Sequence, residues 1–188
     1  LETFQVEATN YALGDGTPRY NPFFIPKMIP DIAPGVISIR HGFKGPNFAT
    51  VSACASSANA LIDSLNYIRL GYSDIIISGG SEAGIIKSGI GGFNAVRALS
   101  TRNDDPKTAS RPFDLDRDGF VLGEGGGCIV LEEYEHAKSR GAKIYAEITG
   151  YGATSDGYDM VAPSGEGAVR CMNMALSTSK NKIDYINT

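Results

Sequence analysis

The stretch NFATVSACASSANALIDSLNYIRLG, residues 47–71, changes from a strand pattern to a helix pattern within a few residues. Residues 48–51 form a short apolar run with β-branched character, which predicts a buried strand. Gly71 supplies a C-terminal helix stop, and before it apolar side chains recur at helical spacing: Ala58, Leu61, Ile62, Leu65 and Ile68. The pattern therefore predicts a strand that turns directly into a helix, with Cys54 at the junction.

Cys54 lies among small side chains, which leave room for a substrate to approach its sulfur: Ser52, Ala53, Ala55, Ser56 and Ser57. A thiol in the first turn of a helix faces unpaired backbone N–H groups and the positive end of the helix dipole. Both favour the nucleophilic thiolate, and a backbone N–H at the turn can donate to an oxyanion formed on an attacked carbonyl. A buried structural cysteine fits the same pattern, since free cysteine is among the most buried residue types. The residues alone leave both interpretations open.

The composition excludes several other classes of protein. A chain of 188 residues can bury a substantial core, and 42% hydrophobic with 20% charged residues is ordinary for a soluble α/β protein. A net charge of −4 disfavours nucleic acid as the main partner. The sequence shows neither an apolar run long enough to span a bilayer nor a basic-then-apolar leader, so we expect no membrane partner and a cytoplasmic location. Three scattered cysteines without a CxxC pair argue against a disulfide framework and a zinc site.

The remaining elements are predicted from periodicity. The apolar run 75–78 predicts a strand parallel to 48–51, because the helix between them would form a βαβ crossover. The proline-rich N-terminal part is expected to be largely irregular, with the end of a helix or a loop at residues 1–9 and at most one helical turn in residues 21–34. Residues 36–39 are expected to begin a helix or a short strand. Glycines 89, 91 and 92 predict a packing loop before a helical stretch at 94–99. Further predicted elements are strands at 128–132, 144–149 and from 182, and helices at 133–140 and from Ser164 to about 179.

Two histidines are candidate partners of the cysteine. His41 lies thirteen positions before Cys54, which permits a Cys–His pair, but such partners usually come from distant sequence, and a surface or packing role is favoured. His136 lies in a polar helix and is expected to be exposed, without an acidic partner at site-like spacing.

The acidic loop of residues 114–118 imitates the start of a calcium-binding loop. The twelfth position of such a loop would be Gly125, where a bidentate Glu is required. We therefore expect these aspartates to form a hydrogen-bonded loop with Arg111 and Arg117 instead.

Three stretches resemble β-ketoacyl-acyl carrier protein synthases, above all the synthase II type of bacterial fatty acid synthesis: VSACASSANALIDSLNYIRLGYSDIIISGGSE, GGFNAVRALSTRNDDPKTASRPFDLDRDGFVLGEGGGCIVLEEYEHAKSRGAKIYAEITGYGATSDGYDM and IDYINT. The resemblance covers the chain essentially from end to end, but only the middle of the family's sequence, which is roughly twice as long. It implies an α/β, thiolase-like αβαβα sandwich that is normally a homodimer. Residues 1–143 would be the later part of the N-terminal half, and residues 144–188 the start of the C-terminal half.

The resemblance also implies an activity. Cys54 matches the family nucleophile, which takes an acyl chain from acyl carrier protein as a thioester. Two family histidines then help to decarboxylate malonyl-carrier protein, and the carbanion attacks the acyl-cysteine carbonyl in a Claisen condensation. Their positions follow residue 188, and neither histidine of this chain matches them, so this stretch alone is not expected to complete the condensation. The carrier protein supplies the phosphopantetheine arm, so no metal or nucleotide cofactor is expected.

Five further residues match family positions. Phe93 resembles the residue that bounds the acyl-chain pocket, Phe120 an aromatic next to the cysteine, and Asp156 falls in a loop that resembles a gate over the site. Arg97 and Arg19 match positive positions that meet the acidic carrier protein. Ordinary packing or a solvated charge is the alternative for each. Two alternatives to fatty acid elongation also stay open: a ketosynthase domain of a polyketide synthase, and a non-catalytic fragment used for binding or assembly.

Overall fold

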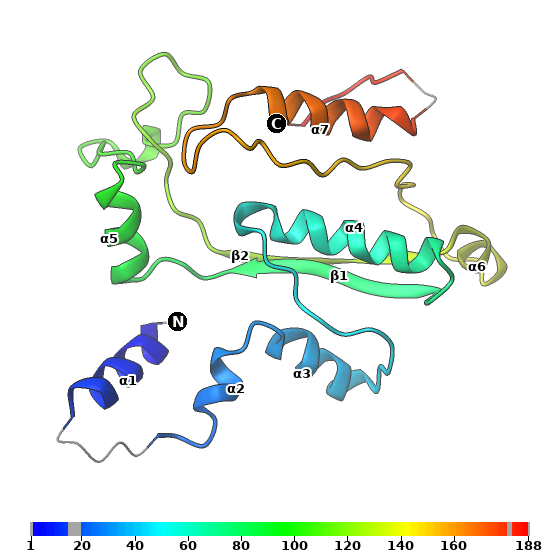
Figure 1. Ribbon diagram of the computed structural model, residues 1–188, viewed down its shortest axis with the longest axis horizontal. Helices are drawn as coiled ribbons and strands as arrows, with labels where there is room; N and C mark the ends of the chain where they lie inside the picture. The colour runs from blue at the N-terminus through cyan, green and yellow to red at the C-terminus, as the bar shows by residue number, and fades with distance from the viewer. Residues whose placement is uncertain (1, 15–19, 180–181, 188) are drawn as a thin grey trace. The chain divides into compact units, whose positions relative to one another are not determined.

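A computed structural model describes residues 2–14, 20–179 and 182–187 (Figure 1). Its contacts divide the chain into two compact units, Leu1–Ser57 with Gly79–Ile129 and Ala58–Ser78 with Val130–Thr188. The helices are α1 (Glu2–Leu13), α2 (Phe24–Met28), α3 (Ile32–His41), α4 (Ser56–Arg69), α5 (Lys87–Ala95), α6 (Tyr134–Ser139) and α7 (Glu166–Ser177). The strands are β1 (Ile75–Glu82) and β2 (Gly125–Glu132), and short 3₁₀ turns cover Ala53–Ala55 and Pro106–Thr108.

The N-terminal part is more helical than its prolines suggest. α1 and α3 agree with the helical alternatives for residues 1–9 and 36–39, whereas residues 21–34 carry α2 and the start of α3, which is more helix than the single turn that we expected. Pro26 and Pro34 are each the third residue of their helix. In a first turn the missing proline N–H would have had no partner inside the helix, so the ring is tolerated there. Gly42 ends α3 with a left-handed φ of 69°, which glycine adopts at little cost.

The two strands form an antiparallel pair, not the predicted parallel βαβ unit. Glu133 N–H donates to the Asp74 carbonyl (2.9 Å) at one end of the pair, and Gly79 lies against Gly127 further along, so the residue numbers run in opposite directions. A Cβ on Gly79 would stand 2.1 Å from the Gly127 carbonyl oxygen. The strand after α4 therefore pairs with a segment about fifty residues later in the chain.

Three predicted strands do not form in the described residues. Residues 48–51, 144–149 and 182–187 lie outside both strands of the one described sheet. A strand exists only where a neighbour completes its ladder of hydrogen bonds, and an alternating pattern cannot supply that neighbour. The second of these segments instead runs beside α4 within the same unit, where Tyr151 Oη donates to Asn66 Oδ1 (3.0 Å). An apolar groove lies there, lined by Ala58, Leu61, Ile62, Leu65, Ile148, Tyr151 and Gly152.

Other elements follow their predictions. α4 begins two residues after Cys54 and is followed by Gly71 with φ 74°, and β2 and α6 cover the expected residues. α7 begins at Glu166, where the Ser164 hydroxyl accepts from the Glu166 N–H (3.1 Å). The glycines at 89, 91 and 92 lie inside α5 and do not form the predicted loop.

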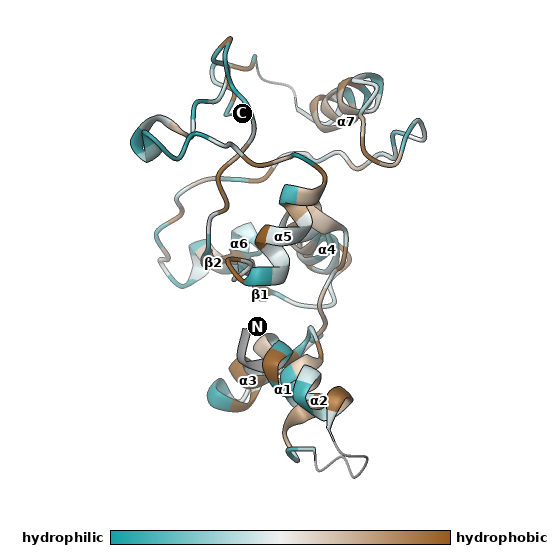
Figure 2. Ribbon diagram, turned by 90° about the vertical axis from the view of Figure 1, so that its left-hand side faces the viewer, coloured by the Kyte–Doolittle hydropathy of each residue, from teal (hydrophilic) through white to brown (hydrophobic). Residues whose placement is uncertain are grey.

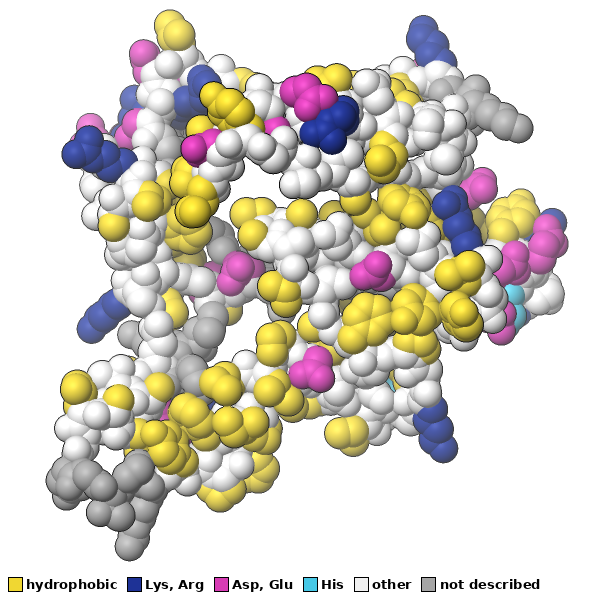
Figure 3. Space-filling model, in the orientation of Figure 1, with side chains coloured by type: hydrophobic (Ala, Val, Ile, Leu, Met, Phe, Trp, Pro, Cys, Tyr) yellow, Lys and Arg dark blue, Asp and Glu magenta, His cyan; other side chains and the backbone are white. Residues whose placement is uncertain are grey.

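The described chain buries few apolar side chains. Among the described residues, only Ala109 and Ala137 are buried hydrophobic residues. The chain exposes 14742 Å², whereas a globular protein of its mass exposes roughly 8,700 Å². Hydrophobic residues are prominent on the segment carrying α1 to α3 (Figures 2 and 3), where Phe23 is 66% and Ile39 84% exposed. Within the described residues, no helix combines the length and apolar character required to cross a bilayer.

Candidate active site around Cys54

Cys54 lies on a sharp backbone turn at the start of α4. Ala53, directly before it, has a φ of 50°, in the left-handed region that residues with a Cβ seldom adopt. Such a conformation costs on the order of 1–3 kcal/mol, and it persists only where the surrounding structure enforces it. The 3₁₀ turn Ala53–Ala55 follows, closed by the Ala55 N–H donating to the Ser52 carbonyl (3.0 Å), and α4 begins at Ser56. We call residues 50–57 the elbow.

Two hydroxyl groups hold the elbow. Ser56 Oγ donates to the Ala53 carbonyl (2.7 Å) and accepts from the Ser52 N–H (2.9 Å). Thr50 Oγ1 donates to the Ser56 carbonyl (2.7 Å). These three hydrogen bonds join residues before Cys54 to Ser56, the first residue of α4, which follows it. They hold the left-handed backbone conformation of Ala53 in place.

A glycine in β1 lets the elbow approach the sheet. A Cβ on Gly80 would lie 1.9 Å from Ser57 Oγ and 3.0 Å from Ser57 Cβ. These contacts place the second residue of α4 directly on the strand. Gly79 and Gly80 serve close packing inside the strand.

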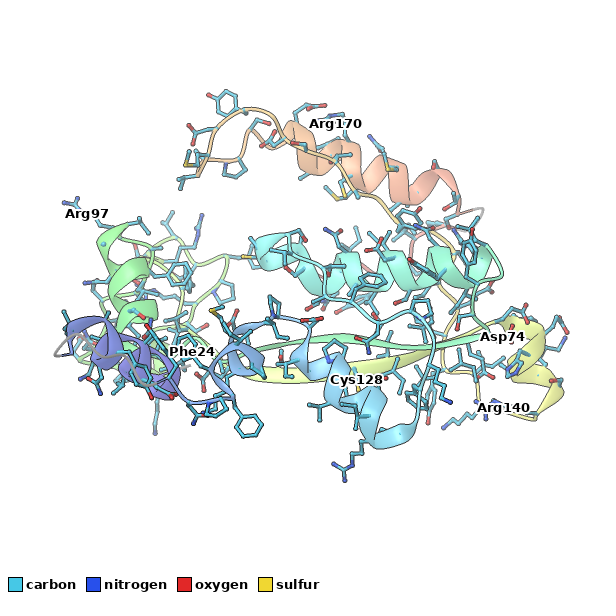
Figure 4. The ribbon with its side chains drawn as sticks, turned by 60° about the horizontal axis from the view of Figure 1, so that its bottom comes forward. Phe24, Asp74, Arg97, Cys128, Arg140 and Arg170 are labelled. Carbon is cyan, nitrogen blue, oxygen red and sulfur yellow. The ribbon has the colours of Figure 1, made fainter. Side chains whose placement is uncertain are left out.

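The sulfur of Cys54 is accessible, because the residue is exposed. Cys128 is exposed as well, and Cys171 is intermediate. Cys128 lies within β2 (Figure 4), where no helix terminus presents free N–H groups. Exposure therefore does not distinguish the first two cysteines, but the backbone does: only Cys54 stands at the start of a helix, where free backbone N–H groups can donate to an oxyanion.

Phe93 and Phe120, predicted from different segments, meet in the unit that contains the elbow. Their rings are T-shaped, with centroids 5.2 Å apart and an interplanar angle of 79°. They are 44% and 45% exposed, so each ring keeps a face open to a ligand. Phe120 is held by an isolated parallel bridge to Leu99, four residues beyond α5. The pair forms an apolar surface that could contact an aliphatic chain.

Arg97 lies just past the end of α5 and is exposed (Figure 4). Its φ of 55° turns the chain out of the helix, and its N–H donates to the Asn94 carbonyl (2.9 Å). A cation at this place also complements the negative end of the helix dipole. Arg19, the second predicted carrier-protein contact, lies outside the described residues.

Asp156 belongs to the other unit and organises the loop before α7. Its carboxylate accepts from the hydroxyl and the N–H of Ser164, and these bonds, followed by one from the Gly167 N–H, lower the pKa of Asp156 from its usual value. A Cβ on Gly167 would lie 2.9 Å from Asp156 Cα, so the loop is packed closely on the start of the helix. The structure therefore shows Asp156 as the anchor of this loop.

The expectation for His136 is wrong, because it has an acidic partner. His136 Nδ1 lies 2.6 Å from Glu132 Oε1, and Arg140 binds both oxygens of the same carboxylate (2.7 and 2.6 Å). The bonds from Arg140 and then His136 lower the pKa of Glu132 from 4.5 to about 2. Glu132 is the last residue of β2 and His136 lies in α6, so the four-residue rule for pairs on a helix does not predict this contact. The cluster joins the end of β2 to α6 near Asp74 (Figure 4).

This cluster predicts a defined loss of stability in acid. Because the pKa of Glu132 is lower in the folded state, its contribution is complete above about pH 4.5 and disappears as the pH falls toward 2. We expect Glu132→Gln to flatten the pH dependence of urea unfolding in this window. The control is Glu135→Gln, which removes a carboxylate from an exposed pair with Lys138 and should change stability little. Equal pH profiles for the parent and Glu132→Gln would contradict the prediction.

The acidic loop is hydrogen-bonded as predicted. Arg111 donates to the Asp116 carbonyl (2.6 and 3.2 Å) and pairs with Asp118 (3.0 Å), and Arg117 donates to the Asp114 carbonyl (2.8 Å). The described ranges contain no group of three or more side chains suited to hold a metal ion.

Comparison with known families identifies the class of protein. Residues 4–137 match the family model described as the N-terminal domain of beta-ketoacyl synthase, and residues 145–188 match that of its C-terminal domain. The chain belongs to the beta-ketoacyl synthase family.

The curated relatives are named 3-oxoacyl-(acyl-carrier-protein) synthases. The chain is 52% identical over 184 residues to 3-oxoacyl-(acyl-carrier-protein) synthase 2 of Rhizobium meliloti (strain 1021), covering 94% of this chain and 44% of that protein. It is 50% identical to the mitochondrial 3-oxoacyl-(acyl-carrier-protein) synthase of Arabidopsis thaliana (97% and 41% covered) and 47% identical to synthase 2 of Staphylococcus aureus (100% and 47% covered). The chain spans less than half the length of these relatives.

Solved structures confirm the predicted fold class. A beta-ketoacyl synthase from Burkholderia phymatum STM815 superposes with a TM-score of 0.87 at 38% identity, over 96% of this chain and 44% of that one. A type II polyketide ketosynthase, solved in complex with its acyl-carrier protein, gives 0.83 at 34% identity over 93% and 45%. The chain therefore has part of the α/β, thiolase-like ketosynthase fold.

Proposed function

We propose that this protein is a 3-oxoacyl-acyl carrier protein synthase of fatty acid elongation, in which Cys54 carries the growing acyl chain. The observation that carries the proposal is the elbow: an accessible sulfur on a left-handed turn at the N-terminus of α4, inside the segment that matches the family's N-terminal domain. Nucleophiles of acyl-transfer enzymes need this combination of access and electrostatic support.

The chain's own residues account for the acyl-transfer half of the reaction. The Cys54 thiolate attacks the carbonyl of an acyl-carrier thioester, a backbone N–H at the elbow supports the oxyanion, and the carrier thiol leaves with a proton from solvent. In the second half, malonyl-carrier protein loses CO₂, and its carbanion attacks the acyl-Cys54 carbonyl. The new carbon–carbon bond gives 3-oxoacyl-carrier protein and returns the thiolate. The groups that assist decarboxylation would follow residue 188.

The relatives favour fatty acid elongation over polyketide synthesis. Three relatives that are 47–52% identical are named 3-oxoacyl-(acyl-carrier-protein) synthases, whereas the type II polyketide ketosynthase is 34% identical. We assign Phe93 and Phe120 to contact with the acyl chain, and Asp156 to the loop that gates it. Arg97 and Arg19 would meet the acidic carrier protein, whose phosphopantetheine arm delivers the substrate, so no metal or nucleotide is required. A similar solved structure contains a ketosynthase in complex with its acyl-carrier protein, which supports a carrier protein as the partner here.

The proposal also includes the oligomeric state, the location and the boundary between the two halves. The protein would be a homodimer and cytoplasmic, and its N- and C-terminal halves would meet near residues 143 and 144. The ranges of the two family matches, which end at 137 and resume at 145, support that division.

The proposal is tested by the position of a covalent acyl group. The protein is incubated with acyl carrier protein charged with a fatty acyl chain, and the acylated cysteine is mapped by mass spectrometry. We expect the acyl group on Cys54, with Cys128 as the internal control because it is equally exposed but lies in a strand. Equal acylation of both would instead indicate a non-catalytic binding or assembly fragment. A preference for a polyketide intermediate would redirect the assignment to polyketide synthesis.

A further inference from the structure

Asp118 accepts several hydrogen bonds in the first unit, and it lies two residues before Phe120. Its carboxylate accepts from Ser100 Oγ (2.6 Å), the Thr101 N–H (2.8 Å) and Thr101 Oγ1 (3.2 Å), and it pairs with Arg111 (3.0 Å). The bond from Ser100, then that from the Thr101 N–H, hold the pKa of Asp118 well below its usual range. Charge-assisted bonds of this kind are stronger than neutral ones.

The bonds of Asp118 join two segments that also meet through their backbones. Phe120 N–H donates to the Ala98 carbonyl (3.0 Å), and Ser100 N–H donates to the Phe120 carbonyl (3.0 Å). Ala98 N–H in turn donates to the Phe93 carbonyl (3.0 Å). A continuous path of backbone hydrogen bonds therefore runs from Phe93 through Ala98 to Phe120. The side-chain rings of Phe93 and Phe120 also contact each other.

Gly119 allows the two segments to approach closely enough for this path. It has a φ of 144°, and a Cβ there would stand 2.4 Å from the Leu99 carbonyl carbon. The short bridge between Leu99 and Phe120 consists of a single residue pair, which is too little to fix its own register. The carboxylate of Asp118, bonded to Ser100 and Thr101 immediately beyond the bridge, supplies the missing restraint.

We propose that Asp118 is a positioning residue: it fixes Phe120 against Phe93 and so sets which acyl chains the site accepts. Asp118 has no need to touch the substrate. This inference rests on the function proposed above, because it assumes that the Phe93–Phe120 surface contacts the acyl chain on its way to Cys54.

The first test measures the restraint itself and does not depend on activity. Asp118→Asn keeps the size of the side chain, but its amide presents a donor where the carboxylate accepts from Ser100, Thr101 and Arg111. We expect hydrogen exchange at the Phe120 and Ser100 amides to rise about tenfold or more, while the amides of β1 and β2 are unchanged. Ser100→Ala, which removes one donor, should give a smaller rise at the same amides.

The matched control is Asp116→Asn. It makes the same chemical change two residues away, at an exposed position whose side chain has no hydrogen bond or ion pair within the described residues. Exchange should stay at the parent rate. Equal exchange at Phe120 in Asp118→Asn and Asp116→Asn would overturn the proposal.

The second test measures selectivity. The rates of acyl transfer to Cys54 from palmitoyl- and hexanoyl-carrier protein give a ratio, which Asp118→Asn should shift at least threefold and Asp116→Asn should not. In a Phe120→Leu background, Asp118→Asn should cause no further shift, since the ring through which it acts is gone. A shift of the same size in that background would overturn the proposal, because it would show a general structural effect. A parent protein that is not acylated would instead defeat the proposed function, while the exchange test would still decide the role of Asp118.

Discussion

Replacing Cys54 with serine is expected to lower the rate of acyl transfer from carrier protein by on the order of 10³-fold or more, the scale seen when a nucleophile is lost. Serine preserves the shape of the elbow, so the hydrogen bonds of Ser56 to Ala53 and Ser52 should survive. Its hydroxyl, however, is far less acidic than a thiol, and the helix N-terminus cannot ionise it at neutral pH. The measurement is a single-turnover assay of acyl-enzyme formation, followed by intact mass.

The matched control for this change is Cys128→Ser. Cys128 is also exposed, but it lies within β2 at a distance in sequence from the elbow. We expect this variant to form acyl-enzyme at the rate of the parent. Retention of full acyl transfer in Cys54→Ser, or its loss in Cys128→Ser, would show that the elbow does not carry the nucleophile.

Replacing Gly79 with alanine is expected to destabilise the protein by about 3 kcal/mol or more, at the upper end of the cost of overpacking. The added Cβ would stand 2.1 Å from the Gly127 carbonyl oxygen and 2.6 Å from Cys128 Cα. Both are backbone atoms of β2, so relief requires the strands to separate. Since Gly80 in the same strand supports the elbow, acyl transfer should fall together with stability. Urea unfolding gives the stability, and the transfer assay gives the activity.

Gly127→Ala is the control on the opposite strand. A Cβ on Gly127 would meet no atom within 4 Å in the structure, so the change should alter stability by no more than about 0.5 kcal/mol. Both variants replace a glycine by alanine at neighbouring positions of the paired strands β1 and β2. They differ in the space available to the added Cβ. Similar stabilities for Gly79→Ala and Gly127→Ala would mean that the strands do not pair in this register.

Several features of the site were accessible from the sequence because they depend on neighbours along the chain. The helical spacing after Cys54 and Gly71 define α4, and the placement of a cysteine at its first turn follows from those alone. Phe93, Phe120 and Arg97 were selected as site residues by family resemblance. The periodicity of the sequence does not indicate their roles.

Other features depend on segments that meet only in the folded chain. The antiparallel partner of β1 lies about fifty residues further on, and nothing in the alternation of its residues specifies which neighbour or direction it takes. The left-handed φ of Ala53 and the contact of Gly80 with Ser57 are likewise imposed from outside the turn.

The amino-acid sequence by itself determined where the helix after the cysteine begins and ends and which family the chain resembles, and that resemblance favours a nucleophilic role for the cysteine. Only the tertiary structure decided the direction of the sheet, the meeting of the Phe93 and Phe120 rings, and the bonding of Asp118 beside them. The physical reason is the range of the interactions. Helix periodicity and capping act over a few residues, whereas ladders, ring contacts and close glycine packing join atoms that the chain brings together only when it folds.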